Sequence, residues 1–202
     1  AGSVTIPLSE ISILPSGRYY GAVVLSDQPL ASVVNTFHAT QGLMSYQGVP
    51  GSQLGQQIYY GPYYNTSSVT SDLELWNVGS ASASYDVTFH GLDGTPQHTV
   101  SGTLTVDQRI SFFAPGLPLP EGVTWVSVST DGQLTGQNIT TGNPYPSTAT
   151  EIQAQPALSG DSGTIALPRA FKNVDEGSGP RSTAIFIGNT SGATSDVTLS
   201  YY

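Results

Sequence analysis

The segment DVTFHGLDGTPQH, residues 86–98, predicts the fold class of this chain. It opens with an alternating pattern that places Val87 and Phe89 on one face of a strand. It then reaches Asp93-Gly94, a pair that favours a tight hairpin turn. A strand, a tight turn and a returning strand predict an antiparallel hairpin.

The same alternation recurs along the whole chain. It is seen in SVTIPL (3–8), GTLTV (102–106), WVSVS (125–129) and DVTLSYY (196–202). No window of a dozen residues keeps its apolar residues at helical spacing, and 23 Gly and 14 Pro are scattered throughout. Short strands separated by frequent turns predict an all-β fold, an antiparallel sandwich.

Composition limits the classes of partner. Only 9% of the residues are charged, with 5 basic against 14 acidic residues and a net charge of −9. The electrostatic field of this net negative charge would repel nucleic acids and anionic membrane surfaces, so we expect neither as a partner. Cysteine is absent, which excludes disulfides, thiolate metal sites and thiol catalysis.

The location of the protein is predicted from the same composition. A chain poor in charge and cysteine and rich in Ser, Thr, Gly and Tyr is typical of exported prokaryotic proteins. No stretch reaches the roughly 18 apolar residues of a membrane helix, and the N-terminus lacks a basic-then-apolar signal. We therefore expect a soluble or processed extracellular or cell-surface protein without membrane insertion.

A repeat organises the sequence. LPSG (14–17) is followed by RYYGAVVLSDQPLASVVN, and LPEG (119–122) is followed by VTWVSVSTDGQLTGQN. Asp27 and Asp131 begin equivalent turns, and Asn35 and Asn138 end equivalent strands. Side-chain bonds to the local backbone would explain these four residues.

A second pair of blocks supports the repeat. One begins at Ile58 and the other at Ile165, and both end in DVT plus an apolar residue. We predict a complete sandwich at residues 58–141, between linkers at 42–57 and 142–164. Residues 1–41 match its C-terminal half and residues 165–202 match its N-terminal half. The fold predicted is thus tandem immunoglobulin-like antiparallel sandwiches, one complete and one split between the two ends.

Half a sandwich exposes an apolar face and an unpaired strand edge. Three outcomes are open: closure within one chain, excision from a longer array, or pairing of one subunit's tail with the next subunit's head. The third builds a head-to-tail fibre from copies of the chain. The predicted assembly interface comprises Val4, Ile6 and Leu8 at one end and Val197, Leu199 and Tyr201 at the other.

The phrases LPSG…GAVVLSDQPLASVVN and LELWNVGSASASYDVTF resemble tandem β-sandwich repeats of large exported bacterial surface proteins. In that family an N-x-G turn precedes a VTV-like strand, and a SDQPIAAVVN-like strand pair closes the unit. The second copy here, STDGQLTGQN, departs from the pattern. The resemblance implies an extracellular structural role and no chemistry.

A possible catalytic motif is GDSG at 160–163, which resembles the nucleophile loop of trypsin-like proteases. His38 and Asp86 precede Ser162 in the order of that family's base and acid. However, His38 lacks the family's context, Thr164 stands where the family has Gly, and the motif falls in a predicted linker. We therefore predict that the chain is not an enzyme.

Metal binding has a similarly weak signal. His90 and His98 flank the predicted hairpin turn and could face each other, with Asp86 or Asp93 as a third ligand. An exposed polar pair explains them better, and no acidic cluster has calcium-loop spacing. We expect no metal and no cofactor.

Surface aromatic residues leave an alternative function open. Tyrosines occur in adjacent pairs, of which one member can face outward, and an outward stripe with Trp125 could stack on sugars or form a protein interface. Asn65, Asn138 and Asn189 stand in N-glycosylation patterns. The function predicted is a structural subunit of an extracellular filament or surface layer. The alternative is an adhesin or carbohydrate-binding module.

Overall fold

The computed structural model describes residues 57–142 continuously. Outside that range it describes residues 11–13, 15, 33–38, 42–47, 54, 151–156, 174–175, 180–181, 196 and 198. The chain divides into two units, residues 1–30 and residues 31–202. All of the regular elements described lie in the second unit.

The described residues form strands joined by turns, with one short 3-10 helix, η3 (Ala114–Gly116), and no α-helix. All of the strand ladders are antiparallel. The all-β antiparallel prediction is therefore confirmed, and no described helix is long and apolar enough to span a bilayer. The strands are β1 (Val33–His38), β2 (Gly42–Gln47), β3 (Ile58–Asn65), β4 (Val69–Asn77), β5 (Ala83–His90), β6 (Pro96–Leu104), β7 (Arg109–Phe113), β8 (Gly122–Thr130), β9 (Leu134–Gly142), β10 (Glu151–Pro156), β11 (Val174–Asp175) and β12 (Pro180–Arg181).

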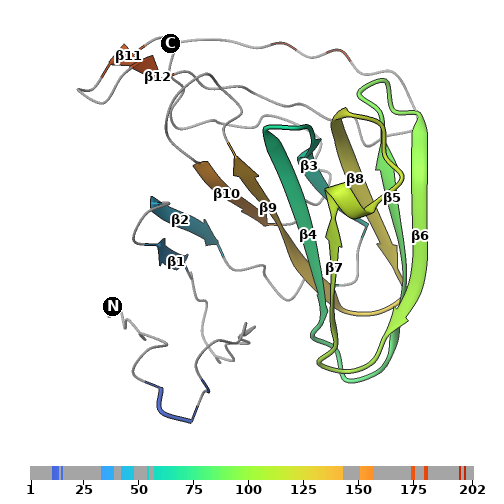
Figure 1. Cartoon of the computed structure of the whole chain (residues 1–202). Helices are drawn as coiled ribbons and strands as arrows, with labels where there is room; N and C mark the ends of the chain where they lie inside the picture. The colour runs from blue at the N-terminus through green and yellow to red at the C-terminus, as the bar shows by residue number, and fades with distance from the viewer. Residues whose placement is uncertain are drawn as a thin grey trace. The chain divides into compact units, whose positions relative to one another are not determined.

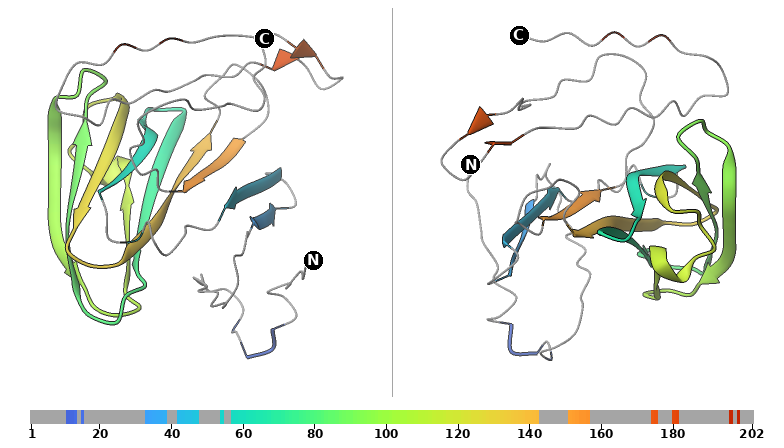
Figure 2. Two further views of the ribbon diagram at one scale, coloured as in Figure 1. Left: turned by 180° about the vertical axis from the view of Figure 1, so that it is seen from behind. Right: turned by 45° about the horizontal axis from the view of Figure 1, so that its top comes forward.

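Strands β3 to β10 form one curled sheet (Figure 1). Its order is β10-β9-β4-β3-β8-β5-β6. β7 lies off this path and pairs with β4 on the edge opposite to β9. β3 and β4 share a ladder only at Asn65 and Thr70, beside the hairpin that joins them. The sheet turns there, so β10-β9-β4-β7 and β3-β8-β5-β6 become two facing layers, as both views in Figure 2 show.

One apolar core lies between the two layers, and the alternation of each strand explains it. Val87 and Phe89 of β5 point inward, as do Val126 of β8 and Leu73 of β4, and all four are fully buried. The Phe89 and Tyr63 rings pack at 5.0 Å between centroids. The other members of the core are Ile58, Tyr60, Leu75, Ala83, Tyr85, Leu104, Phe112, Ala114, Leu119, Val128 and Leu134.

The β5–β6 hairpin forms at the predicted turn. Gly94 has a φ of +84°, a conformation that glycine adopts without steric cost. Its backbone N donates to the oxygen of Gly91, and the Asp93 carboxylate accepts from the backbone N of Thr95 at 3.0 Å. The local chemistry of the Asp-Gly pair thus ends β5 and starts β6.

The LPEG turn is held by a side chain from a distant strand. Asn65 Nδ2 donates to the carbonyl oxygens of Leu119 at 3.0 Å and Pro120 at 3.3 Å. Leu119 is buried in the core, and Gly122 has a φ of +142° where β8 begins. The motif therefore combines a core anchor with a backbone conformation that favours glycine.

The ladders interleave the two halves of the module formed by residues 58–142. Strands β3, β4 and β5 come from its first half, and β7, β8 and β9 come from its second half. β8 lies between β3 and β5, while β4 lies between β7 and β9. Most of the first half's hydrogen-bonding partners therefore come from the second half.

Two segments expected to be linkers contain strands. β2 lies within residues 42–57 and pairs with β1, and β10 lies within residues 142–164 and pairs with β9. Each strand is only six residues long, and Gly, Pro and Ser are frequent in the segments around them. Such short strands among turn residues give little signal in the sequence.

Candidate functional site

The face of layer β3-β8-β5-β6 that points away from the core carries a group of aromatic residues. Tyr59 of β3, His90 of β5, and Trp125 and Ser127 of β8 lie on this outer face, because each alternates with a buried neighbour. The register joins them across strands, with His90 opposite Trp125 and Tyr59 opposite Ser127. We call these four residues the Trp125 cluster.

The His90 ring stacks on the indole of Trp125. The centroids are 3.9 Å apart and the rings are inclined by 8°. His90 Nδ1 lies 3.3 Å from the carbonyl oxygen of Gly94, so this nitrogen must be the donor. In the neutral imidazole Nε2 is then the acceptor, and it takes a hydrogen bond from the Ser127 hydroxyl at 2.9 Å.

The environment of His90 favours its neutral form. Partial burial lowers the pKa of the imidazole below its ordinary value of 6.5, and the hydrogen bond to Gly94 opposes this in part. Ser127 is only 8% exposed. The Ser127–His90 pair therefore orients the ring and does not present a nucleophile to solvent.

The opposite side of the indole faces β3, where Gly61 stands. A Cβ placed on Gly61 would lie 3.3 Å from Trp125 Cβ, so the two residues are immediate neighbours. Tyr59 stands further along β3, with its ring centroid 6.0 Å from that of Trp125 and inclined by 43°. The indole thus stacks on His90 of β5, and its neighbours on β3 are Tyr59 and a residue without a side chain.

Hydroxyl groups continue this outer face toward β6. Thr88 and Thr99 are opposite each other, and their hydroxyl oxygens are 3.1 Å apart. The next pair, Asp86 and Ser101, is joined by a hydrogen bond from the serine hydroxyl to the carboxylate. The face therefore offers aromatic rings beside a row of small polar groups.

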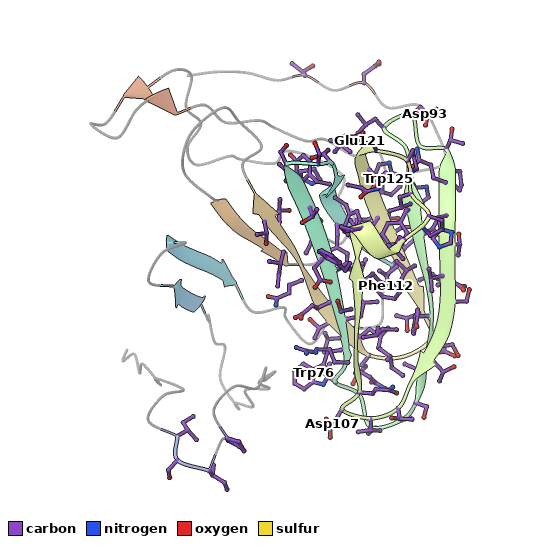
Figure 3. The ribbon with its side chains drawn as sticks, in the orientation of Figure 1. Trp76, Asp93, Asp107, Phe112, Glu121 and Trp125 are labelled. Carbon is purple, nitrogen blue, oxygen red and sulfur yellow. The ribbon has the colours of Figure 1, made fainter. Side chains whose placement is uncertain are left out.

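The second tryptophan lies on the other layer, beside charged residues. Trp76 of β4 is opposite Arg109, whose guanidinium lies 3.4 Å from a carboxylate oxygen of Glu74. Figure 3 shows Trp76 toward the end of the module that carries Asp107, whereas Trp125 lies toward the other end, with Asp93 and Glu121.

The two histidines do not face each other. His98 is opposite Phe89 and stacks on its ring at 6.3 Å, so it lies on the face opposite to His90. Asp86 accepts from Ser101, and Asp93 accepts from Thr95 in the turn, which holds the Asp93 pKa below its ordinary value. In the described parts of the chain no group of three His, Asp or Glu side chains could hold a metal ion.

Most of the remaining predicted site residues lie outside the described residues. This applies to the assembly residues Val4, Ile6, Leu8, Val197, Leu199 and Tyr201, and also to Ser162 and Asn189. Only the backbone of His38 is described, in β1.

The two described sequons have structural partners. Asn138 is 1% exposed, lies in the middle of β9 and donates to the carbonyl oxygen of Pro62 at 2.8 Å, so it does not end a strand as expected. A glycan on its nitrogen would have to replace a buried hydrogen bond. Asn65 is partly buried and holds the LPEG turn, as described above.

Asp131 also differs from the expectation of a purely local bond. Its carboxylate accepts from the backbone N of Ser84, at the start of β5, at 2.7 Å. Asn77, which the sequence did not single out, is fully buried. Asn77 donates to Ala81 and Leu104 and accepts from Gly79. The N-x-G spacing of residues 77–79 was the available signal.

No family model and no curated protein matches this sequence. One solved structure that resembles it is titled "Crystal Structure of Thermotoga maritima 1070". The match has a TM-score of 0.45 at 11% identity, and it covers 52% of this chain and 95% of that chain. This level of similarity identifies no family.

Proposed function

We propose that the chain is a structural subunit of an extracellular filament or surface layer. In this proposal it consists of tandem immunoglobulin-like sandwiches, one complete and one split. The terminal half-domains, residues 1–41 and 165–202, join neighbouring subunits head to tail by strand complementation.

The interleaved ladders of residues 58–142 are the observation that supports this proposal best. β8 pairs on both sides with first-half strands, and β4 pairs on both sides with second-half strands. A half-module with this topology would leave strand edges and apolar faces without partners. Each terminal half therefore needs a complementary half, from its own chain or from another.

The two described end hairpins strengthen the case for a repeat. β1 contains Asn35 and pairs with β2, just as β9 contains Asn138 and pairs with β10. The sequence makes Asn35 and Asn138 equivalent. The same antiparallel pair thus follows both copies of the LPxG segment.

The repeat also predicts one contact of the split sandwich. Val87 of the DVT motif lies opposite Val128, three residues before Asp131. The equivalent residues are Val197 of the second DVT motif and Val24, three residues before Asp27. We therefore expect Val24 and Val197 to be ladder partners when the halves combine.

Cysteine cross-linking tests this contact, because the natural chain has no cysteine. The variant Val24→Cys with Val197→Cys is oxidised and run on a non-reducing gel. A ladder of covalent oligomers is expected. Mixing the two single variants should give a covalent dimer. The matched control, Val87→Cys with Val128→Cys, should form its disulfide within one chain and establishes that this register permits the bond.

The alternatives give different products. A cyclised monomer in place of the ladder would show that the halves close within one chain, and the filament proposal would be wrong. Absence of any Val24–Val197 disulfide, while the control pair forms one, would reject strand complementation altogether.

A further inference from the structure

We propose that the Trp125 cluster binds a neutral polysaccharide, with one pyranose ring stacked on the indole of Trp125. This site belongs to the complete module and is independent of the proposed joining of subunits. Four features of the outer face lead to this assignment: a fixed and partly exposed aromatic ring, a neighbouring residue without a side chain, adjacent hydroxyl groups and the sign of the charge.

The indole is held in position before any ligand arrives. His90 packs against one face at 3.9 Å, and His90 is itself fixed by Ser127 on one nitrogen and by Gly94 on the other. A rigid ring loses little conformational entropy on binding, which favours affinity. In this proposal the Ser127–His90 hydrogen bond fixes the imidazole that holds Trp125 in place.

Trp125 is partly exposed, and its neighbour on β3 has no side chain. That neighbour is Gly61, and a side chain at this position would begin 3.3 Å from Trp125 Cβ and would crowd the tryptophan. The Tyr59 ring, whose centroid is 6.0 Å from that of the indole and which is inclined by 43°, adds a second aromatic surface. The C–H groups on one face of a pyranose ring pack well against such aromatic surfaces.

Polar groups on the same outer face complete the surface. The hydroxyl pair Thr88–Thr99 and the pair Asp86–Ser101 follow the aromatic residues along the same outer face. The hydroxyl groups can donate to and accept from sugar hydroxyls, and the carboxylate can accept from them. Recognition of a sugar needs this combination of an apolar ring and a few polar partners.

Charge selects a neutral ligand. None of β3, β5, β6 and β8 contains Lys or Arg, and Asp86 contributes a negative charge to the face. The whole chain carries a net charge of −9. Acidic polysaccharides would be repelled at low salt, so neutral polymers are the class that fits.

Single-tryptophan proteins give a direct test. The chain has two tryptophans. Trp76→Phe therefore leaves only Trp125 as a reporter, and Trp125→Phe leaves only Trp76. Hydroxyethyl cellulose and galactomannan are titrated into each protein. The fluorescence emission of Trp125 should change and reach a plateau as either neutral polymer is added, whereas the emission of Trp76 should not change. Polygalacturonate, an acidic polymer, should change the emission of neither tryptophan.

Affinity electrophoresis in the same polymers supplies the second measurement. Trp125→Ala should raise the apparent Kd for the neutral polymers by roughly tenfold or more, as expected when a central aromatic contact is removed. Trp76→Ala, the matched control on the other layer, should be retarded like the natural protein. Circular dichroism checks that each variant is folded. If Trp125→Ala does not fold, Trp125→Phe replaces it in the measurement.

Three results would overturn the proposal. One is the absence of a response of Trp125 to every neutral polymer tested. The second is equal loss of retardation in the Trp76 and Trp125 variants. The third is that Trp125→Ala abolishes self-association while retardation is unchanged, which would make the outer face a contact between copies of the chain.

Discussion

At the scale of single residues, two buried tyrosines of β3 differ in whether their hydroxyl groups are hydrogen-bonded. Burial raises the pKa of both phenols, and the charge of Asp72 adds to the effect at Tyr63. Tyr63 donates its hydroxyl to the carbonyl oxygen of Phe112 at 2.6 Å. The Tyr60 hydroxyl is buried and finds no partner among the described residues.

Replacing each tyrosine by phenylalanine should therefore give opposite results. Tyr63→Phe should lower the free energy of unfolding by about 1–2 kcal/mol, because the hydrogen bond to Phe112 is lost. Tyr60→Phe should leave stability unchanged or raise it by up to about 1 kcal/mol, because an unpaired buried hydroxyl is removed. Urea unfolding measures both, and equal losses would contradict the assignment.

His90 should make stability depend on pH in one direction. Its folded pKa is lowered, so the unfolded chain binds the proton more readily. This contribution to stability is fully present above the ordinary value of 6.5 and is lost as the pH falls through the lowered folded pKa. His90→Phe, which keeps a ring on Trp125, should reduce the decline.

Proton NMR measures the same quantity directly. The ring resonance that disappears in His90→Phe belongs to His90, and its titration midpoint should lie below 6.5. A midpoint at or above that value would show that the imidazole is not desolvated by the cluster.

At the scale of elements, turn residues decide where strands begin. The Asp93-Gly94 turn follows from local chemistry alone, but the LPEG turn needs Asn65 from a separate hairpin. The β8 strand starts at Gly122, whose φ of +142° is rarely adopted by other residues.

Gly122→Ala should lower the free energy of unfolding by about 1–3 kcal/mol through backbone strain. No atom lies within 4 Å of the added Cβ, so crowding does not contribute. Gly116→Ala is the matched control, since its Cβ also meets nothing within 4 Å and its φ is not positive. Its effect should stay within about 0.5 kcal/mol. Similar effects of the two variants would contradict the role of Gly122.

At the scale of the whole molecule, the net charge of −9 opposes any assembly of copies. Under the proposed filament function, each joint brings two acidic subunits together. Salt shortens the Debye length from about 30 Å at 0.01 M to about 8 Å at 0.15 M.

Self-association should therefore strengthen when sodium chloride rises over that range. Light scattering at fixed protein concentration measures this. Assembly that weakens with salt would show that the joints rest on attraction between opposite charges.

The sequence alone determined the local properties of this protein. Period-two alternation identified strand residues such as Val87 and Val126, Asp93-Gly94 predicted a hairpin that the structure contains, and the LPxG segments predicted a repeat. These signals are readable because side-chain direction and turn conformation depend on neighbouring residues.

Only the tertiary structure decided which strands are neighbours. Tyr59, His90 and Trp125 form one cluster because β8 lies between β3 and β5, and no local pattern contains that information. For the same reason the sequence misjudged Asn138, which is buried beside Pro62, and the two histidines, which lie on opposite faces. Strand pairing joins residues far apart in the chain, so it depends on how the whole core packs.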